Sequence, residues 1–398
     1  MPNTLLTATA VTRESLRILH QKLSFVGNVN RQHDDSFAKS GAKIGDSLKI
    51  RLPNQYIVRS GATLSTQDTT ESSTTLQVAT QKGVDLNFTS ADLTMSLDDF
   101  SKRILEPAMS VLAAAIEADA LNMRKDVYLQ VNNTAAAVTF ARLLEGRKKM
   151  VDSLTPAGTW NALLNTTDSV NLVDALKGLF QDSKEVATQY REGRMGRGAG
   201  FDFMETTHLS SQLRGAGDAA YVVNTSTGIT SGSATVAVTA GTGTIKQGEI
   251  VTIAGVNSVH PETKVDSGVP QQFVITADYA GGAGNISVSP VPVTSGAAQN
   301  VVINSAGAGK AVAIAGTVST NYGQSLLFHP DAFAFATADL VLPSGVDFSR
   351  REVLDGISMR VVRQYDINAD RFPTRIDVLY GYKAIRPQLA CRLANLAG

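Results

Sequence analysis

The sequence predicts an α+β protein in which an all-β module is inserted into a mixed core of helices and strands. The first observation is a compositional island, residues 225 to about 320, which is nearly free of charge and rich in Gly, Ser, Thr, Ala and Val. The second is that ordinary helix and strand patterns lie on both sides of this island. Because neither flank has enough strands to close a core alone, we expect the two flanks to share one sheet.

Bulk composition excludes several classes of protein. The chain has 398 residues, of which 43% are apolar, enough to bury a large core over two or three domains. Its formal net charge is zero, so overall charge indicates neither a nucleic-acid partner nor an anionic membrane. No stretch reaches the roughly 18 apolar residues that cross a bilayer, and the N-terminus lacks the basic start of a secretory signal. We expect no membrane partner.

The first element is a short amphipathic helix at residues 11–23, because Leu16, Leu19 and Leu23 recur at helical spacing. Residues 27–43 are polar and punctuated by glycine, which indicates an arm rather than a part of the core.

An extended hairpin follows the arm. Alternating apolar and polar residues at 48–52, 76–78 and 84–88 predict strands. Between the first two, residues 59–75 are rich in Ser, Thr and Gly and hold scarcely any apolar anchor. Two strands with a long polar tip cannot bury themselves alone, so we expect the hairpin to lie on something else.

A long helix is expected from residue 100 to about 127. Ser96, followed three residues later by Asp99, supplies an N-cap in the manner of a capping box. Apolar side chains then recur in steps of four, at Phe100, Ile104, Ala108, Leu112, Ile116 and Ala120. Such a helix of roughly 30 residues would be about 45 Å long, and Pro107 should kink it. We interpret it as a spine that sets the length of the molecule.

The remaining elements follow from shorter patterns. Helices are expected at residues 139–151, 168–180 and 183–191, a strand at 201–206, and a flexible basic loop at 193–200. After the island, apolar or alternating runs lie at 326–328, 332–338, 357–363 and 375–380. Inside the island, short strands at 234–238, 250–253, 272–275, 286–288 and 301–303, separated by Gly, Asn or Pro, are typical of a small antiparallel barrel or sandwich.

The search for catalytic and metal sites gives no candidate. Gly309 and Lys310 superficially resemble the end of a phosphate-binding loop, but Asn304 stands where that motif needs glycine and Ala311 replaces its hydroxyl residue. The five histidines are scattered without metal-ligand spacing. Cys391 has no histidine close in sequence and is interpreted as a buried or tail thiol. We therefore predict no catalytic residue, no metal and no cofactor, and expect a protein that is not an enzyme.

One group of basic residues is a candidate contact with nucleic acid. Arg147, Lys148 and Lys149 form the basic end of a predicted helix and could face DNA phosphates. The competing interpretation is a solvated helix end, which is the usual fate of isolated basic residues in a chain of zero net charge.

Several short strings run in order along nearly the whole chain: residues 29–31, 41–46, 105–109, 255–260, 263–264, 328–334, 365–368, 372–375 and 379–381. With the order of arm, hairpin, spine, mixed domain, inserted β-module and returning strands, the chain resembles the major capsid proteins of tailed bacteriophages, which have the Hong Kong 97-type fold. Within that group it is most similar to the P22-type coat proteins, which carry an inserted domain. The resemblance lies in collinear order, since none of the strings is a catalytic motif.

The resemblance implies a division of the chain into parts. They are an N-terminal arm (1–44), an extended hairpin or E-loop whose strands join the peripheral domain (45–90), the spine helix and peripheral domain (91–138), the first part of the axial domain (139–223), the inserted β-barrel-like domain (224–323), and the returning axial and peripheral strands with a C-terminal tail (324–398).

The resemblance also implies a function and partners. The chain would form hexamers and pentamers of an icosahedral head around double-stranded DNA, contacting the DNA weakly and without sequence preference. A portal protein would be a further partner. Only about 95 residues precede the spine helix, too few for a fused scaffolding domain, so a separate scaffolding protein is expected. The protein would reside in the virion shell after assembly in the host cytoplasm.

Two segments are our candidate contacts between subunits. The hairpin tip offers Arg59, Thr63, Asp68 and Glu71, and a loop of the inserted module offers Glu262, Lys264 and Asp266. Residues 59–75 contain no lysine. The lysine-to-asparagine cross-link that some relatives form there is therefore not expected, which leaves noncovalent contacts multiplied over many copies.

Two other classes of protein remain open at this point. An encapsulin-type compartment shares the fold and encloses a cargo enzyme instead of a genome, but the inserted module favours the phage branch. A surface-binding protein with an immunoglobulin-like module is the other, and the missing signal peptide argues against it.

Overall fold

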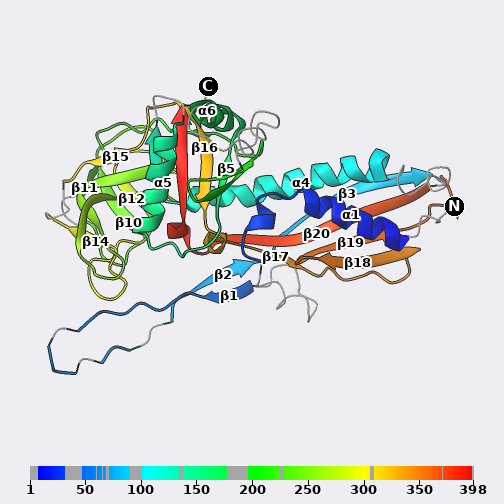
Figure 1. Ribbon diagram of the computed structural model, residues 1–398, viewed down its shortest axis with the longest axis horizontal. Coiled ribbons are helices and arrows are strands. Elements are labelled where there is room, and N and C mark those ends of the chain that lie inside the picture. Colours follow the sequence, from blue (N-terminus) through cyan, green and yellow to red (C-terminus); the bar gives the residue numbers. More distant parts are fainter. Residues whose placement is uncertain are drawn as a thin grey trace. The chain divides into compact units, whose positions relative to one another are not determined.

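The computed structural model describes residues 8–31, 47–59, 61–64, 66–68, 71–89, 101–133, 138–176, 196–224, 228–304, 309–369 and 371–396. The chain divides into two compact units. The first comprises Met1–Arg51, Ser73–Asn122 and Phe333–Ile385, and the second comprises Leu52–Ser72, Met123–Ala332 and Arg386–Gly398. Both units contain helices and strands (Figure 1), as expected for the α+β class.

The first unit is built on a five-stranded antiparallel sheet in the order β17-β20-β19-β18, with β3 also paired to β20. Its strands are β3 (Thr80–Thr89), β17 (Phe333–Ala338), β18 (Phe348–Leu354), β19 (Ile357–Arg363) and β20 (Arg371–Ala384). Strand β3 precedes the island and the other four follow it, so this sheet joins both flanks. Helices α1 (Ala8–Lys22) and α4 (Glu106–Leu121) pack against each other, α1 also against β18 and α4 against β3 (Figure 1).

The hairpin base belongs to the first unit. Strands β1 (Ser47–Arg51) and β2 (Ser73–Gln77) pair antiparallel, as the alternating pattern predicted. Ile50 and Leu76 are buried in one apolar cluster with Leu379 of β20. The approach is so close that a Cβ at Gly381 would lie 2.1 Å from the Gln77 carbonyl oxygen. A glycine is therefore required where β20 passes under the hairpin.

The spine is helical over the expected length, but its helix type changes along it. A π-helical turn (Ser101–Leu105) leads into α4, and a 3-10 turn (Asn122–Asp126) follows it. Pro107 is the second residue of α4 and follows directly on the π-helical turn, so the change of helix type lies beside the proline at which a kink is expected. The residues proposed for the N-cap, 96–99, lie outside the described residues.

The second unit contains a seven-stranded mixed sheet in the order β4-β21-β16-β5-β7-β6, with β8 also paired to β16. Its strands are β4 (Gln130–Asn133), β5 (Trp160–Leu164), β6 (Arg197–Gly198), β7 (Phe201–Glu205), β8 (Gln212–Leu213), β16 (Asn321–Phe328) and β21 (Ala390–Leu396). The strands β16 and β21 follow the island and the others precede it. The expected sharing of a sheet by the two flanks is therefore present in both units.

Two helices cover one face of this mixed sheet. Helix α5 (Phe140–Asp152) contributes Leu143 and Met150 to the core, and α6 (Thr166–Leu176) contributes Leu172. Within the loop expected at residues 193–200, the structure describes residues 196–200, and there β6 pairs with β7 in a tight hairpin. The helix expected at residues 183–191 lies outside the described residues.

The inserted module is a closed β-barrel. Its strands are β9 (Val222–Val223), β10 (Thr235–Thr239), β11 (Ile250–Val259), β12 (Asp266–Ile275), β13 (Gly284–Ser289), β14 (Val301–Ile303) and β15 (Val312–Ile314). They run β14-β11-β12-β13-β10-β9, with β15 paired to β11. A bridge between Val222 and Ala311 joins β9 to the start of β15 and closes the ring.

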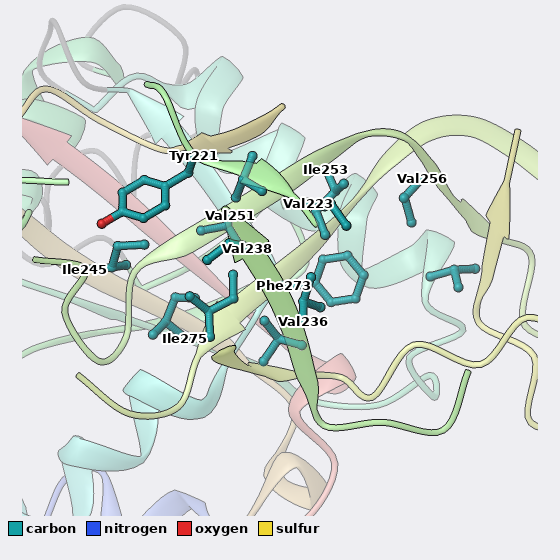
Figure 2. Close-up of a cluster of buried hydrophobic side chains, with 14 residues drawn as sticks. Tyr221, Val223, Val236, Val238, Ile245, Val251, Ile253, Val256, Phe273 and Ile275 are labelled. Atoms are coloured by element: carbon teal, nitrogen blue, oxygen red, sulfur yellow. The ribbon is translucent and has the colours of Figure 1, made fainter. Parts of the chain in front are cut away.

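The barrel has its own apolar core. Alternating residues of its strands point inward, among them Val236 and Val238 of β10 and Phe273 and Ile275 of β12 (Figure 2). Strand pairing places the neck of the insertion at Arg214 and Thr320, whose backbone N–H and carbonyl oxygen lie 2.9 Å apart. The domain boundaries at residues 224 and 323 were inferred from the change in composition and stay a prediction.

Candidate assembly surfaces

The hairpin tip, residues 52–72, is organised by two of its own side chains. The Arg59 guanidinium donates to the carbonyl oxygens of Gly61 and, at 3.3 Å, Thr63. The Gln67 side chain accepts a hydrogen bond from the Ile57 N–H at 2.9 Å and donates to the Ile57 carbonyl at 2.5 Å. Arg59 and Thr63 therefore shape the turn.

The tip also displays apolar side chains that the polar reading of its sequence missed. Val58 is 88% exposed and Leu64 is 79% exposed, and Tyr56 and Ile57 are exposed beside them. The two acidic candidates on the tip, Asp68 and Glu71, are exposed as well. Burial of side chains such as Val58 and Leu64 against another surface is worth about 1.5–3 kcal/mol each. The tip thus offers apolar contact area with a polar border.

A second candidate surface is the finger, which we define as residues 256–270 at the end of the β11–β12 hairpin. Asp266 builds this finger: its carboxylate accepts hydrogen bonds from Asn304, Asn257 and the Gly268 N–H at 2.8, 3.2 and 2.8 Å. The Asn304 amide and the Gly268 N–H lower the pKa of Asp266. Because these hydrogen bonds engage the Asp266 carboxylate, its first role is to hold the loop together, and a contact with another subunit would be secondary.

The other two charged candidates of the finger differ in role. The Lys264 ammonium donates to the Gln299 carbonyl oxygen at 3.2 Å, and partial burial lowers the pKa of Lys264. The Glu262 side chain is exposed. Two valines that the sequence analysis did not select, Val265 and Val269, are also exposed on the finger. The finger therefore exposes the carboxylate of Glu262, the hydrogen-bonded carboxylate of Asp266 and two apolar side chains.

The three candidate DNA-facing residues lie in different environments on α5. The Arg147 guanidinium lies 5.7 Å from the centre of the Trp160 ring, and the exposed Lys148 ammonium pairs with Asp152 at 2.9 Å. Lys149 does not belong to an exposed basic surface. Its ammonium donates to Gln272 Oε1 of the barrel at 2.9 Å, and burial lowers the pKa of Lys149.

Gln272 also joins the barrel to the edge of the mixed sheet. Its side-chain oxygen accepts a hydrogen bond from the Gln130 N–H, and its side-chain nitrogen donates to the Gln130 carbonyl oxygen, both at 3.0 Å. The amide thus pairs with β4 as another strand would, and it satisfies backbone groups of an edge strand. Nothing in the sequence pattern distinguished this glutamine from its neighbours.

The described residues contain no group of three or more side chains suited to hold a metal ion. Cys391 is fully buried, and burial raises the pKa of its thiol to about 12, so it is not an activated nucleophile. Within the same part of the chain, no helix is long and apolar enough to cross a membrane.

Two hairpin ends, the tip and the finger, therefore expose apolar and polar side chains that could contact a partner. Among the described residues, no catalytic group is assembled. Comparison with known protein families then identifies the kind of protein to which this chain belongs. The family model described as "P22 coat protein - gene protein 5" matches residues 31–393. The chain belongs to the P22 coat protein family. It is thus a major capsid protein of the Hong Kong 97-type fold, a structural protein that assembles with copies of itself into an icosahedral shell in the virion. This membership favours neither the encapsulin nor the surface-binding alternative.

Solved structures give weaker likenesses. A chain of Mycobacterium phage Che8 is similar at 12% identity, with a TM-score of 0.45 and coverage of 92% of this chain and 88% of that one. A capsid chain of the cyanophage P-SCSP1u has 11% identity, a TM-score of 0.43 and coverage of 91% and 86%. A capsid chain of Ralstonia phage GP4 has 7% identity, a TM-score of 0.44 and coverage of 91% and 86%. A search of curated protein sequences found no significant match.

Proposed function

We propose that the subunit assembles as hexamers and pentamers of a tailed-phage head that encloses double-stranded DNA. The observation that carries this proposal is the family match over residues 31–393. The hairpin tip supports it physically, because its exposed apolar side chains would gain free energy by burial against a neighbouring copy.

The parts of the chain take matching roles in this proposal. The hairpin of residues 45–90 lies across a neighbouring subunit through its tip, with Arg59, Thr63, Asp68 and Glu71 bordering the apolar residues. The finger reaches a second neighbour, with Glu262 as its exposed charge. Residues 139–223 with the returning strands supply the axial domain, and residues 91–138 with β17–β20 supply the peripheral domain.

The other partners follow from the same role. A separate scaffolding protein directs assembly in the host cytoplasm, and a portal protein occupies one vertex. Arg147 and Lys148 supply weak, salt-dependent contact with packaged DNA, since each exposed cation near a phosphate releases counterions on binding. The subunit itself carries out no catalysis.

Substitutions at the tip test the contact between subunits. Val58→Asp places a charge where the proposal requires apolar burial, so we expect assembled shells to fall at least tenfold in yield, measured by sedimentation of the assembly mixture. Val58→Ile is the matched control and should assemble as the parent does, with both variants showing the parent's circular dichroism. Equal assembly of the Asp variant would show that the tip is not an interface.

A further inference from the structure

A buried carboxylate of the first unit holds the segment that follows α1. Glu117, in the middle of α4, is 1% exposed. Its Oε1 accepts a hydrogen bond from the Val26 N–H and its Oε2 accepts one from the Phe25 N–H, both at 3.1 Å. These two N–H groups open the 3-10 turn Val26–Asn28, where backbone donors lack partners within the turn. One side chain of the spine thus caps a turn that is about 90 residues away in sequence.

The capped segment, residues 24–31, lies on the first unit through further contacts. Phe25 and Val26 are fully buried, and the Phe25 ring meets the Phe333 ring edge-on with centres 5.5 Å apart. The Asn30 N–H donates to the Phe333 carbonyl at 3.1 Å, and the Phe335 N–H donates to the Asn30 carbonyl at 3.1 Å. The segment therefore covers Glu117 and adds a short parallel bridge to β17.

We propose that Glu117 is a proton-controlled latch: a proton on its carboxyl group favours docking of residues 24–31, and loss of that proton favours their release. The geometry supports this linkage, because the segment that donates the hydrogen bonds to Glu117 also helps to remove the carboxyl group from water. A protonated carboxyl group still has acceptor capacity for the two N–H groups, while an ionised one would be buried with no ion pair to a cation among the residues that the structure describes.

The electrostatics agree with this geometry. Burial raises the pKa of Glu117 from 4.5 to about 7, although the N–H groups of Val26, Phe25 and Ser24 pull it down. The docked form therefore holds its proton at pH values where the released form, with its ordinary pKa, has lost it. Docking is strongest below pH 4.5, weakens as the pH rises toward 7, and changes little above that value. Between the two pKa values the docking constant falls about tenfold per pH unit.

Two charged side chains on the helices that pack around Glu117 form ion pairs with other residues. A third, Asp355, contacts the docked segment itself, so the experiment needs a control for it. The pKa of Glu117 is set by burial and by the backbone N–H groups of residues 24–26. On α4, Asp119 pairs with Lys82 at 2.7 Å, and on α1, Glu14 pairs with Arg17 at 2.6 Å. Asp355 pairs with His20 of α1 at 2.9 Å and with Arg31 of the docked segment at 2.8 Å.

The contact between His20 and Asp355 is an ion pair only when the histidine is protonated. An experiment on the latch must therefore separate the two groups. Asp355→Asn removes the charge partner of both His20 and Arg31 and leaves Glu117 in place. Glu117→Gln removes the titrating group and leaves Asp355 in place. Asp347→Asn, which removes a carboxylate paired with Arg363 on the same unit, controls for the loss of one negative charge.

Hydrogen exchange of the full, unassembled chain tests the proposal. Exchange of the Phe25 and Val26 amides is measured from pH 5 to 8.5 and corrected for the intrinsic pH dependence of exchange. We expect the protection factors of the parent, of Asp355→Asn and of Asp347→Asn to fall by at least tenfold between pH 5 and 7.5. In Glu117→Gln, protection should be lower at pH 5 than in the parent and should lose most of its fall with pH, with only the smaller contribution of the His20–Asp355 pair remaining.

Two results would overturn the proposal. One is a parent protein whose Phe25 and Val26 protection does not change with pH, an outcome that requires no variant to fold. The other is a Glu117→Gln variant that keeps the slope of the parent, which would assign the titration to another group. Neither result bears on shell assembly, so the latch and the proposed function fail separately.

Discussion

At the scale of single residues, one carboxylate of the second unit ties together strands from both sides of the insertion. Asp168 Oδ2 accepts hydrogen bonds from Ser325 Oγ of β16 at 2.6 Å, Asn395 Nδ2 of β21 at 2.9 Å and Asn165 Nδ2 at 3.0 Å. The Asp168 N–H in turn donates to Asn165 Oδ1 at 2.7 Å, so Asn165 caps α6. Burial raises the pKa of Asp168 against these hydrogen bonds.

Removal of this carboxylate should be costly. Asp168→Ala leaves three buried donors without their acceptor, and we expect the free energy of unfolding to fall by about 3 kcal/mol. Urea unfolding of the unassembled chain measures it. The control is Asp152→Ala, which removes an exposed carboxylate paired with Lys148 and should cost less than about 1 kcal/mol. Equal losses in the two variants would show that the Asp168 network does not join the flanks.

At the scale of elements, one side chain connects the barrel to the mixed sheet. Gln272→Leu removes both hydrogen bonds to the Gln130 backbone and the one from Lys149, leaving polar groups at a partly buried contact. We expect a loss of about 2 kcal/mol in stability and faster exchange of the Gln130 amide. Gln247→Leu, at an exposed glutamine of the same barrel, should change neither quantity. An unchanged Gln130 exchange rate in the Gln272 variant would contradict the described contact.

The absence of lysine from the hairpin tip leads to a prediction about covalent cross-links between subunits. Residues 52–72 contain no lysine, so we expect the contacts made by the tip to be noncovalent. Shells dissolved in hot detergent should therefore run on a denaturing gel as a single band near the 42.1 kDa of one chain. A ladder of covalent oligomers would contradict this expectation.

The elements differ in how far their sequence could reveal them. The barrel strands were predictable because polar and apolar residues alternate, as at Val236 and Val238, over a core that each strand meets on one face. Strand β21 was missed and interpreted as a tail, because Arg392 interrupts its apolar pattern. That arginine is fully buried in the folded chain, a placement that composition disfavours.

The candidate contacts show a similar limit. Exposure of Arg59, Asp68 and Glu262 follows from local polarity, so the sequence could nominate them. The engagement of Lys149 by Gln272 depends on residues more than 100 positions apart, and no local pattern predicts it. The exposed valines of the tip and finger were also missed, since an exposed apolar residue such as Val58 is indistinguishable in sequence from a buried anchor.

At the scale of the whole molecule, the chain leaves apolar side chains exposed on two hairpins that belong to different parts of its fold. Val58 and Leu64 on the tip and Val265 on the finger are each more than 60% exposed. Isolated exposed apolar residues are common, but groups of them on hairpin ends are typical of contact surfaces. Family membership supplies the partner, a second copy of the same chain.

Electron cryomicroscopy of the purified chain, concentrated alone and with the proposed scaffolding protein, tests this account most directly. We predict closed icosahedral shells in which the tip of each hairpin lies on a neighbouring subunit, with Val58 and Leu64 covered. A population of single chains that never closes into shells under these conditions, with Val58 and Leu64 remaining in contact with solvent, would contradict it.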